Sequence, residues 1–287
     1  MKSDVSISYV ITNPDKAVGR GQKVLPNSFA HAAAEMDVRV EKPQNGDEIT
    51  SLLQQSPVDL VLTVAYGQLI REPALSIPPM GWLNIHFSLL PAWRGAAPVQ
   101  YALMNGETQT GITVFRLDAG MDTGPVFASW TTSINSEETT STLLASLAQS
   151  AAEHIGEIVK QVTSGVAPVA QSDVGVSYAP KLKKADGKID LHSPSKVALA
   201  KIRALGENPG AFVSFRRQRL GITRAEISYA SHENTQPGEL QATKNELILF
   251  LADGAIRLLS VIPQGKQEMS GADFARGARI NVGELCE

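Results

Sequence analysis

The sequence is organised around the stretch Met80-Gly-Trp-Leu-Asn-Ile-His-Phe-Ser-Leu-Leu-Pro-Ala-Trp-Arg-Gly-Ala-Ala-Pro-Val-Gln100. Its first part, Trp82 to His86, is predicted as a short buried strand. Asn84 and His86 are two residues apart, so they point to the same side of that strand. The loop that follows is unusually apolar across residues 89–93. A polar pair at the carboxyl end of a strand, followed by a stiff apolar loop, is what an open α/β sheet offers to a flat ligand.

The segments on either side predict alternating strands and helices. Residues 58–65 form a continuous apolar run, which is typical of a parallel strand covered on both faces. Residues 13–23 carry Asn-Pro and Gly-x-Gly signals and are predicted as an irregular, exposed, basic loop. The alternation favours an α/β fold with a doubly wound, mainly parallel, Rossmann-like sheet. Strands are predicted at residues 5–12, 38–40, 58–65, 82–86, 110–117 and 126–132, and helices at residues 27–35, 47–55, 96–105 and 143–163.

A second, smaller domain is expected after the long helix. Between residues 167 and 188 the composition turns to Pro, Ser, Gly and Lys, which favours a linker. A helix at residues 194–205 precedes short β-like runs, which predict a small β-barrel of OB-like type. We therefore expect a first domain at residues 1–170, a linker at 171–188 and a β-barrel domain at 189–287. The β-like runs cover residues 212–215, 220–227, 247–251 and 256–263.

Composition indicates a globular protein, with 43% hydrophobic and 19% charged residues. The net charge of −3 hides an asymmetry, because residues 181–287 hold 16 Lys and Arg against 12 Asp and Glu. A basic half beside an acidic half favours a polyanionic partner, although ordinary surface charge explains it equally well.

The sequence also indicates the cellular compartment in which the protein works. Cys286 is the one cysteine, so no disulfide within the chain and no cysteine-based metal cluster can form. No apolar run approaches the roughly 18 residues of a membrane span, and the first residues lack the pattern of a signal or transit peptide. We expect a cytoplasmic monomer with no membrane and no DNA partner.

Several separated motifs resemble those of one family, the folate-dependent formyltransferases. Two of them are Asn84-Ile-His-Phe-Ser-Leu-Leu-Pro-Ala-Trp-Arg-Gly95 and Asp118-Ala-Gly-Met-Asp-Thr-Gly124. Four further motifs are similar to those of members that act on initiator tRNA, and all stand in the family's order. These four are Asn13-Pro-Asp-Lys-Ala-Val-Gly-Arg-Gly21, Tyr178-Ala-Pro-Lys-Leu182, Asn208-Pro-Gly-Ala211 and Gly265-Lys-Gln-Glu-Met-Ser-Gly-Ala-Asp-Phe274.

The resemblance implies transfer of a formyl group from 10-formyltetrahydrofolate to the amino group of methionine on initiator tRNA. It assigns the catalytic work to Asn84, His86 and Asp122. The chemistry agrees: an amine attacking a formamide needs a donor for the developing oxyanion and an acceptor for the amine proton. Asn84 has the amide N–H, His86 can exchange a proton, and an Asp122 carboxylate nearby would orient the imidazole and raise its pKa. No metal is required.

The resemblance also implies two binding regions. For folate it points to the apolar loop, to the turn at residues 66–70 and to the acidic loop, namely Ser88, Leu89, Leu90, Pro91, Tyr66, Gly67, Gln68, Leu69, Ile70 and Asp118. Lys and Arg side chains can contact tRNA phosphates, and Gly19 and Gly21 allow close backbone approach. The expected tRNA residues are Lys16, Arg20, Lys23, Lys181, Lys183, Lys184, Arg216, Arg217 and Arg219.

Two alternatives stay open from the sequence. The family begins with a strand, a Gly-Thr-Pro turn and a helix that have no counterpart before the strand predicted at residues 5–12. Either the true start lies upstream and Met1 is an internal methionine, or the chain is a non-catalytic remnant that binds tRNA or folate; we favour the first because the remaining motifs are intact. A formyltransferase acting on a small amine is the other alternative. Taken without the resemblance, His86 is an ordinary buried histidine and Asp122 a turn residue.

Overall fold

The computed structural model describes residues 5–18, 23–231 and 233–287. The chain divides into two compact units. The first comprises residues 1–94, 112–130 and 149–177, and the second comprises residues 95–111, 131–148 and 178–287. No described helix is long and apolar enough to span a bilayer.

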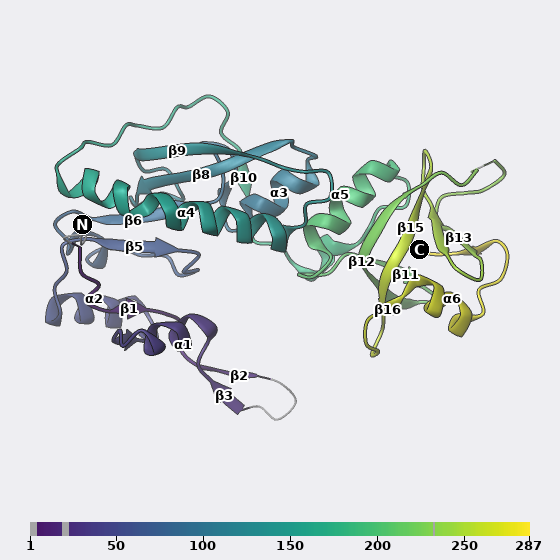
Figure 1. Cartoon of the computed structure of the whole chain (residues 1–287), viewed down its shortest axis with the longest axis horizontal. Coiled ribbons are helices and arrows are strands. Elements are labelled where there is room, and N and C mark those ends of the chain that lie inside the picture. The colour runs from purple at the N-terminus through teal and green to yellow at the C-terminus, as the bar shows by residue number, and fades with distance from the viewer. Residues whose placement is uncertain (1–4, 19–22, 232) are drawn as a thin grey trace. The chain divides into compact units, whose positions relative to one another are not determined.

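A sheet of four strands, in the order β5-β6-β8-β9, carries the central stretch (Figure 1). β5 (Val61–Val64) and β6 (Trp82–His86) are parallel, and β8 (Gln109–Arg116) runs antiparallel to β6. β9 (Val126–Ser133) lies at the far edge. β6 is therefore a central strand, and its buried side chains explain why the sequence there is apolar apart from the polar residues at its end.

The strand predicted at residues 58–65 is present, but the prediction that both of its faces are covered was wrong. Only Val61–Val64 form β5, and burial alternates along it. Leu62 and Val64 are 42% and 44% exposed, so only one face of β5 is covered by described residues. The continuous apolar run had suggested two covered faces.

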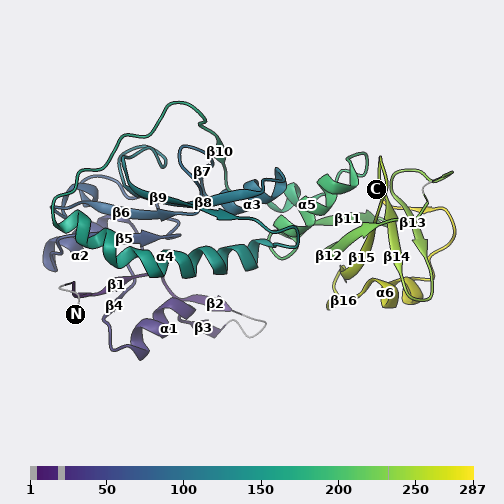
Figure 2. The same ribbon diagram turned by 45° about the horizontal axis from the view of Figure 1, so that its top comes forward.

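A separate two-stranded parallel sheet pairs β1 (Val10–Ile11) with β4 (Val40–Glu41). β1 is shorter than the strand predicted at residues 5–12, since only Val10 and Ile11 pair with β4. The expected irregular loop contains an antiparallel hairpin, in which β2 (Lys16–Val18) pairs with β3 (Lys23–Leu25) (Figure 2). Val18 and Val24 favour an extended backbone here, and the Gly-x-Gly signal had obscured it.

Helices cover these sheets. Asn27 caps α1 by accepting from the backbone N–H of Ala30 at 2.9 Å, and Asn45 caps α2 by accepting from two backbone N–H groups. The second half of α4 lies along one face of the four-stranded sheet (Figure 2), where the Trp130 indole of β9 donates to Ser150 Oγ at 2.9 Å. The elements are α1 (Ser28–Glu35), α2 (Gly46–Gln55), η1 (Ala74–Ser76), α3 (Pro98–Met104) and α4 (Thr140–Thr163).

The second unit ends in a closed antiparallel barrel. Its strand order is β11-β12-β15-β14-β13-β17, with β16 paired to β15. The two ends of this sheet meet, because Ser214 and Glu287 exchange backbone hydrogen bonds of 2.8 and 2.7 Å. The strands are β11 (Phe212–Phe215), β12 (Gln218–Ser228), β13 (Glu239–Ala242), β14 (Leu247–Phe250), β15 (Ala255–Pro263), β16 (Met269–Ser270) and β17 (Glu284–Leu285).

The rest of this unit comes from the predicted linker and the helices. β10 pairs with the short β7, and Gly95 is required there because a Cβ would lie 2.6 Å from the Ala179 carbonyl oxygen. The predicted fold class, a Rossmann-like α/β unit with a smaller β-barrel, is confirmed. The remaining elements are β7 (Arg94–Gly95), β10 (Tyr178–Ala179), η2 (Lys184–Gly187), α5 (Ser195–Leu205) and α6 (Gly271–Ala278).

Candidate active site

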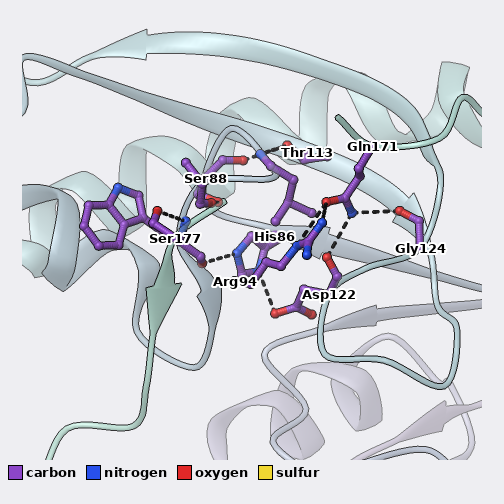
Figure 3. A network of polar contacts seen from close by, with 11 residues as sticks. His86, Ser88, Arg94, Thr113, Asp122, Gly124, Gln171 and Ser177 are labelled. Atoms are coloured by element: carbon purple, nitrogen blue, oxygen red, sulfur yellow. Dashed lines mark hydrogen bonds and ion pairs between the residues drawn. The ribbon is translucent and has the colours of Figure 1, made fainter. Parts of the chain in front are cut away.

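His86 is the last residue of β6 and is only 5% exposed. Figure 3 shows the polar contacts around it. Its Nε2 lies 2.9 Å from the Trp93 carbonyl oxygen, and its Nδ1 lies 3.8 Å from Asp122 Oδ2. A carbonyl only accepts hydrogen bonds, so the contact assigns the ring proton to Nε2. In the neutral imidazole, the nitrogen that can take up a proton is therefore Nδ1, on the side of Asp122.

Burial lowers the pKa of His86 below its ordinary value, because a charged imidazole is costly inside the protein. The Asp122 carboxylate and the Trp93 carbonyl both act in the opposite direction. The sequence-based expectation that Asp122 would raise the pKa had the right sign for that one contact. The net direction is set by the burial of His86, which could not be read from the sequence.

Asp122 reaches His86 from the tight loop between β8 and β9. Its backbone is left-handed, with φ of 53°. The loop passes so close to β8 that a Cβ on Gly124 would lie 1.8 Å from the Arg116 carbonyl oxygen. Asp118 Oδ1 accepts from Thr123 Oγ1 at 2.7 Å, so that carboxylate, which was expected to contact folate, holds the loop together.

Asn84 is the third member of the expected catalytic set. It lies two residues before His86 on β6, half-buried, between Thr63 of β5 and Phe115 of β8 in the strand register. Residues two apart on a strand share a face, so Asn84 and His86 are presented on the same side of the sheet.

Hydrogen bonds within the apolar loop after β6, and between this loop and Thr113, hold its shape. Ser88 is fully buried, and its Oγ donates to the Ala92 carbonyl at 2.6 Å. Thr113 Oγ1 donates to the Ser88 carbonyl at 2.7 Å and accepts from Leu90 N at 3.1 Å. The Ser88 hydroxyl thus serves the loop's own shape, whereas Leu89, Leu90 and Pro91 are half-buried.

In the turn at residues 66–70, some side chains are packed in the core and others are exposed. The Tyr66 ring packs against the core around Ile70 and Trp82. Gly67 has a positive φ of 76°, and Leu69 is 61% exposed. The Tyr66 carbonyl accepts from the Asn13 side chain at 3.3 Å, which brings the loop after β1 beside this turn. The turn therefore offers backbone and Leu69, while the Tyr66 side chain belongs to the core.

Gln171 and Ser177 also belong to this site, although the sequence placed both in a linker. The Gln171 amide bonds to the Arg94 guanidinium and to the loop that carries Asp122 (Figure 3). Ser177 Oγ accepts from Trp93 N at 2.9 Å. One sequence signal pointed toward such partners: Arg94 is a lone cation in an apolar loop, and a half-buried guanidinium requires acceptors.

The expected tRNA residues of the first unit are only partly described. Lys16 is exposed on β2. Arg20 and the side chain of Lys23 lie outside the described residues. In the second unit Lys181, Lys183 and Lys184 are all exposed around η2.

The three arginines near the β11–β12 turn differ from one another. Arg216 forms two hydrogen bonds to Glu284, of 2.5 and 2.9 Å. Arg219 stacks on the Phe212 ring at 3.9 Å and donates to the Gly210 carbonyl at 2.8 Å. Arg217 is exposed at the tip of the turn. Arg217 is thus the best placed of the three for a phosphate, and Arg219 stabilises the fold.

Two further features of the structure concern metal binding and a cavity in the second unit. Among the described residues, no group of three or more His, Cys, Asp and Glu side chains is arranged to hold a metal ion. A cavity of about 590 Å³ in the second unit is lined by residues that include Arg203, Glu226 and Arg257, and by none of the expected catalytic or folate residues.

Comparison with known proteins defines the class. The formyl transferase profile matches residues 1–159, and the profile of the formyl transferase C-terminal domain matches residues 181–279. The chain belongs to the formyl transferase family, as the motifs had indicated.

One relative is more specific. The chain is 40% identical over 287 residues to the methionyl-tRNA formyltransferase of Thermobifida fusca (strain YX), covering 99% of this chain and 92% of that protein. Among solved structures, HypX from Aquifex aeolicus in complex with tetrahydrofolic acid has a TM-score of 0.68 at 17% identity, covering 97% of this chain and 49% of that chain. The methionyl-tRNA formyltransferase from Clostridium thermocellum has a TM-score of 0.56 at 20% identity, covering 72% and 92%. These two structures support the fold.

Proposed function

We propose that this chain transfers the formyl group of 10-formyltetrahydrofolate to the amino group of methionine on initiator tRNA. The observation that carries the proposal is the His86–Asp122 pair at the carboxyl end of β6, in a chain of the formyl transferase family. The 40% identical relative is a methionyl-tRNA formyltransferase, which supports this choice of acceptor. We further propose that the protein works as a cytoplasmic monomer on RNA and not on DNA.

His86 takes up the amine proton through Nδ1. The Nε2–H is held by the Trp93 carbonyl, and burial keeps the ring neutral near pH 7, so Nδ1 has a lone pair to offer. When Nδ1 is protonated, the Asp122 carboxylate 3.8 Å away stabilises the imidazolium. Asn84, on the same face of β6, donates its amide N–H to the formyl oxygen as that oxygen gains negative charge.

The residues around this pair fit a folate. A flat heterocycle needs apolar walls and a few backbone hydrogen-bonding groups. Half-buried Leu89, Leu90 and Pro91 offer the first, and the exposed backbone of Gly67 with Leu69 offers the second. When bound, the folate would supply the formyl group, whose carbon gains a bond to the methionine nitrogen and loses its bond to the folate nitrogen. His86 returns to that departing nitrogen the proton that it took from the amine.

The tRNA is held through its phosphates. Lys16 in the first unit and Lys181, Lys183 and Arg217 in the second are exposed cations, and we assign Arg20 and Lys23 to the same task from the sequence. Contacts of this kind give affinity that falls with salt and little base selectivity.

The direct test incubates the 287-residue chain with 10-formyltetrahydrofolate and methionyl initiator tRNA, and measures formylmethionine released from the tRNA by mass spectrometry. Uncharged tRNA, free methionine and a small amino sugar serve as competing acceptors. Transfer to the charged tRNA alone supports the proposal. Equal kcat/KM for the amino sugar would overturn the acceptor, and tRNA binding without any transfer would overturn the enzymatic assignment.

A further inference from the structure

Gln171 links two loops that meet at His86. Its Oε1 accepts from Arg94 Nε at 3.2 Å and from Arg94 Nη2 at 2.7 Å. Its Nε2 donates to the carbonyls of Asp122 and Gly124, at 2.9 and 2.8 Å (Figure 3). One amide side chain therefore uses both its oxygen and its nitrogen to join the loop after β6 to the loop before β9.

The segment that contains Gln171 is anchored a second time. Ser177 Oγ accepts from Trp93 N, and the Ser177 carbonyl accepts from Arg94 N, both at 2.9 Å. The Trp93 carbonyl is the group that holds His86 Nε2. Residues 171–177 thus fix the partner of each ring nitrogen of His86: the Trp93 carbonyl through Ser177 and Asp122 through Gln171.

The geometry of Asp122 makes this fixing important. The 3.8 Å between Asp122 Oδ2 and His86 Nδ1 is longer than a hydrogen bond, by about 0.6 Å against the usual upper limit of about 3.2 Å. A small movement of the loop decides whether the two groups meet. The Asp118–Thr123 bond sets the shape of the loop itself, whereas the Gln171 bonds tie its backbone to Arg94.

We propose that Gln171 is a positioning residue, which holds the Asp122 carboxylate at the distance from His86 that formyl transfer requires. Its effect on turnover rests on the proposed function, and its effect on the position of Asp122 does not. The groups that face His86 are the Asp122 carboxylate, the Trp93 carbonyl and the Phe115 ring, which is perpendicular to the imidazole. Asp122 is the charged group among these, so the His86 titration reports its distance.

Three variants separate the roles of the amide. Gln171→Met keeps the length of the side chain and removes all four hydrogen bonds. Gln171→Glu keeps acceptors for Arg94 and removes the donors to Asp122 and Gly124. The control is Gln161→Ala, an exposed glutamine on α4. Thermal midpoints show that each variant is folded, and the His86 ring is titrated by NMR in the wild type and in Gln171→Met.

We expect Gln171→Met and Gln171→Glu each to lower kcat by about 10- to 100-fold, with KM for methionyl-tRNA within about threefold of the wild type. The pKa of His86 should fall further in Gln171→Met, because the carboxylate that raises it is no longer held close. Gln161→Ala should match the wild type in both measurements.

The outcomes distinguish the two proposals. A wild-type chain that transfers no formyl group defeats the proposed function, and the His86 titration in Gln171→Met still decides the positioning role. An active wild type with an unchanged His86 titration in Gln171→Met overturns the positioning role alone. Wild-type turnover in Gln171→Glu overturns it too, because that variant keeps only the bonds to Arg94.

Discussion

Gly124→Ala is the sharpest test of how the Asp122 loop is packed. The added Cβ would lie 1.8 Å from the Arg116 carbonyl oxygen, whereas real Cβ atoms stay at least about 3.0 Å from such an atom. The obstacle is backbone of a central strand, so the loop must retreat by about 1.2 Å. The Gly124 carbonyl, which accepts from Gln171, moves with it.

The consequence falls on catalysis more than on folding. A misplacement of about 1 Å costs on the order of 10²-fold in rate, so kcat/KM for methionyl-tRNA should fall by about 100-fold, equivalent to about 2.7 kcal/mol. Forcing a side chain into packed structure costs about 1–3 kcal/mol of stability. Initial rates of formylmethionyl-tRNA formation and urea unfolding measure the two effects.

A matched glycine serves as the control. Gly156 lies inside α4, and a Cβ there meets nothing within 4 Å. Gly156→Ala should leave activity unchanged and add about 0.5–1 kcal/mol of stability, since alanine favours a helix interior over glycine. If Gly124→Ala retained wild-type kcat/KM, the tight approach of the loop to β8 would not be what places Asp122, and the reasoning would fail.

Three further predictions follow from local chemistry. Neutral His86 is the proposed base and its pKa lies below 6.5, so on the acid side activity should be lost only below pH 6.5. Asp122→Asn removes a carboxylate that raises this pKa, so the acid limb of the remaining kcat/KM should move to lower pH. A move of that limb to higher pH would contradict the assignment. Burial raises the pKa of Cys286 to about 12 from 9.0, so its reaction with a thiol reagent at pH 8 should be about 10³-fold slower in the folded protein than in urea, and equal rates would refute the burial. Arg217→Ala should lower the salt slope of tRNA binding by about 1 without changing the thermal midpoint, whereas Arg219→Ala should lower the midpoint; the reverse pattern would refute our division of these arginines.

The sequence by itself determined the order of elements and the family. Apolar periodicity and turn residues located β6, α4, α5 and the barrel strands β11, β12, β14 and β15, because those patterns depend on local chain geometry. The shorter barrel strands β13, β16 and β17 were not predicted. Motif order indicated the formyl transferase family, which the comparisons confirm. The domain boundaries and the roles of Asn84, His86 and Asp122 stay predictions.

Only the tertiary structure decided how the site is held together. The net direction of the His86 pKa depends on burial by segments far away in the sequence, and Gln171 reaches Asp122 across 49 residues of chain. Ser88 and Asp118 were assigned to folate from motif position, yet their side chains bond within their own loops. Motifs preserve which residue types stand in order along the chain, whereas the partner that each polar group finds depends on which loops the fold brings together.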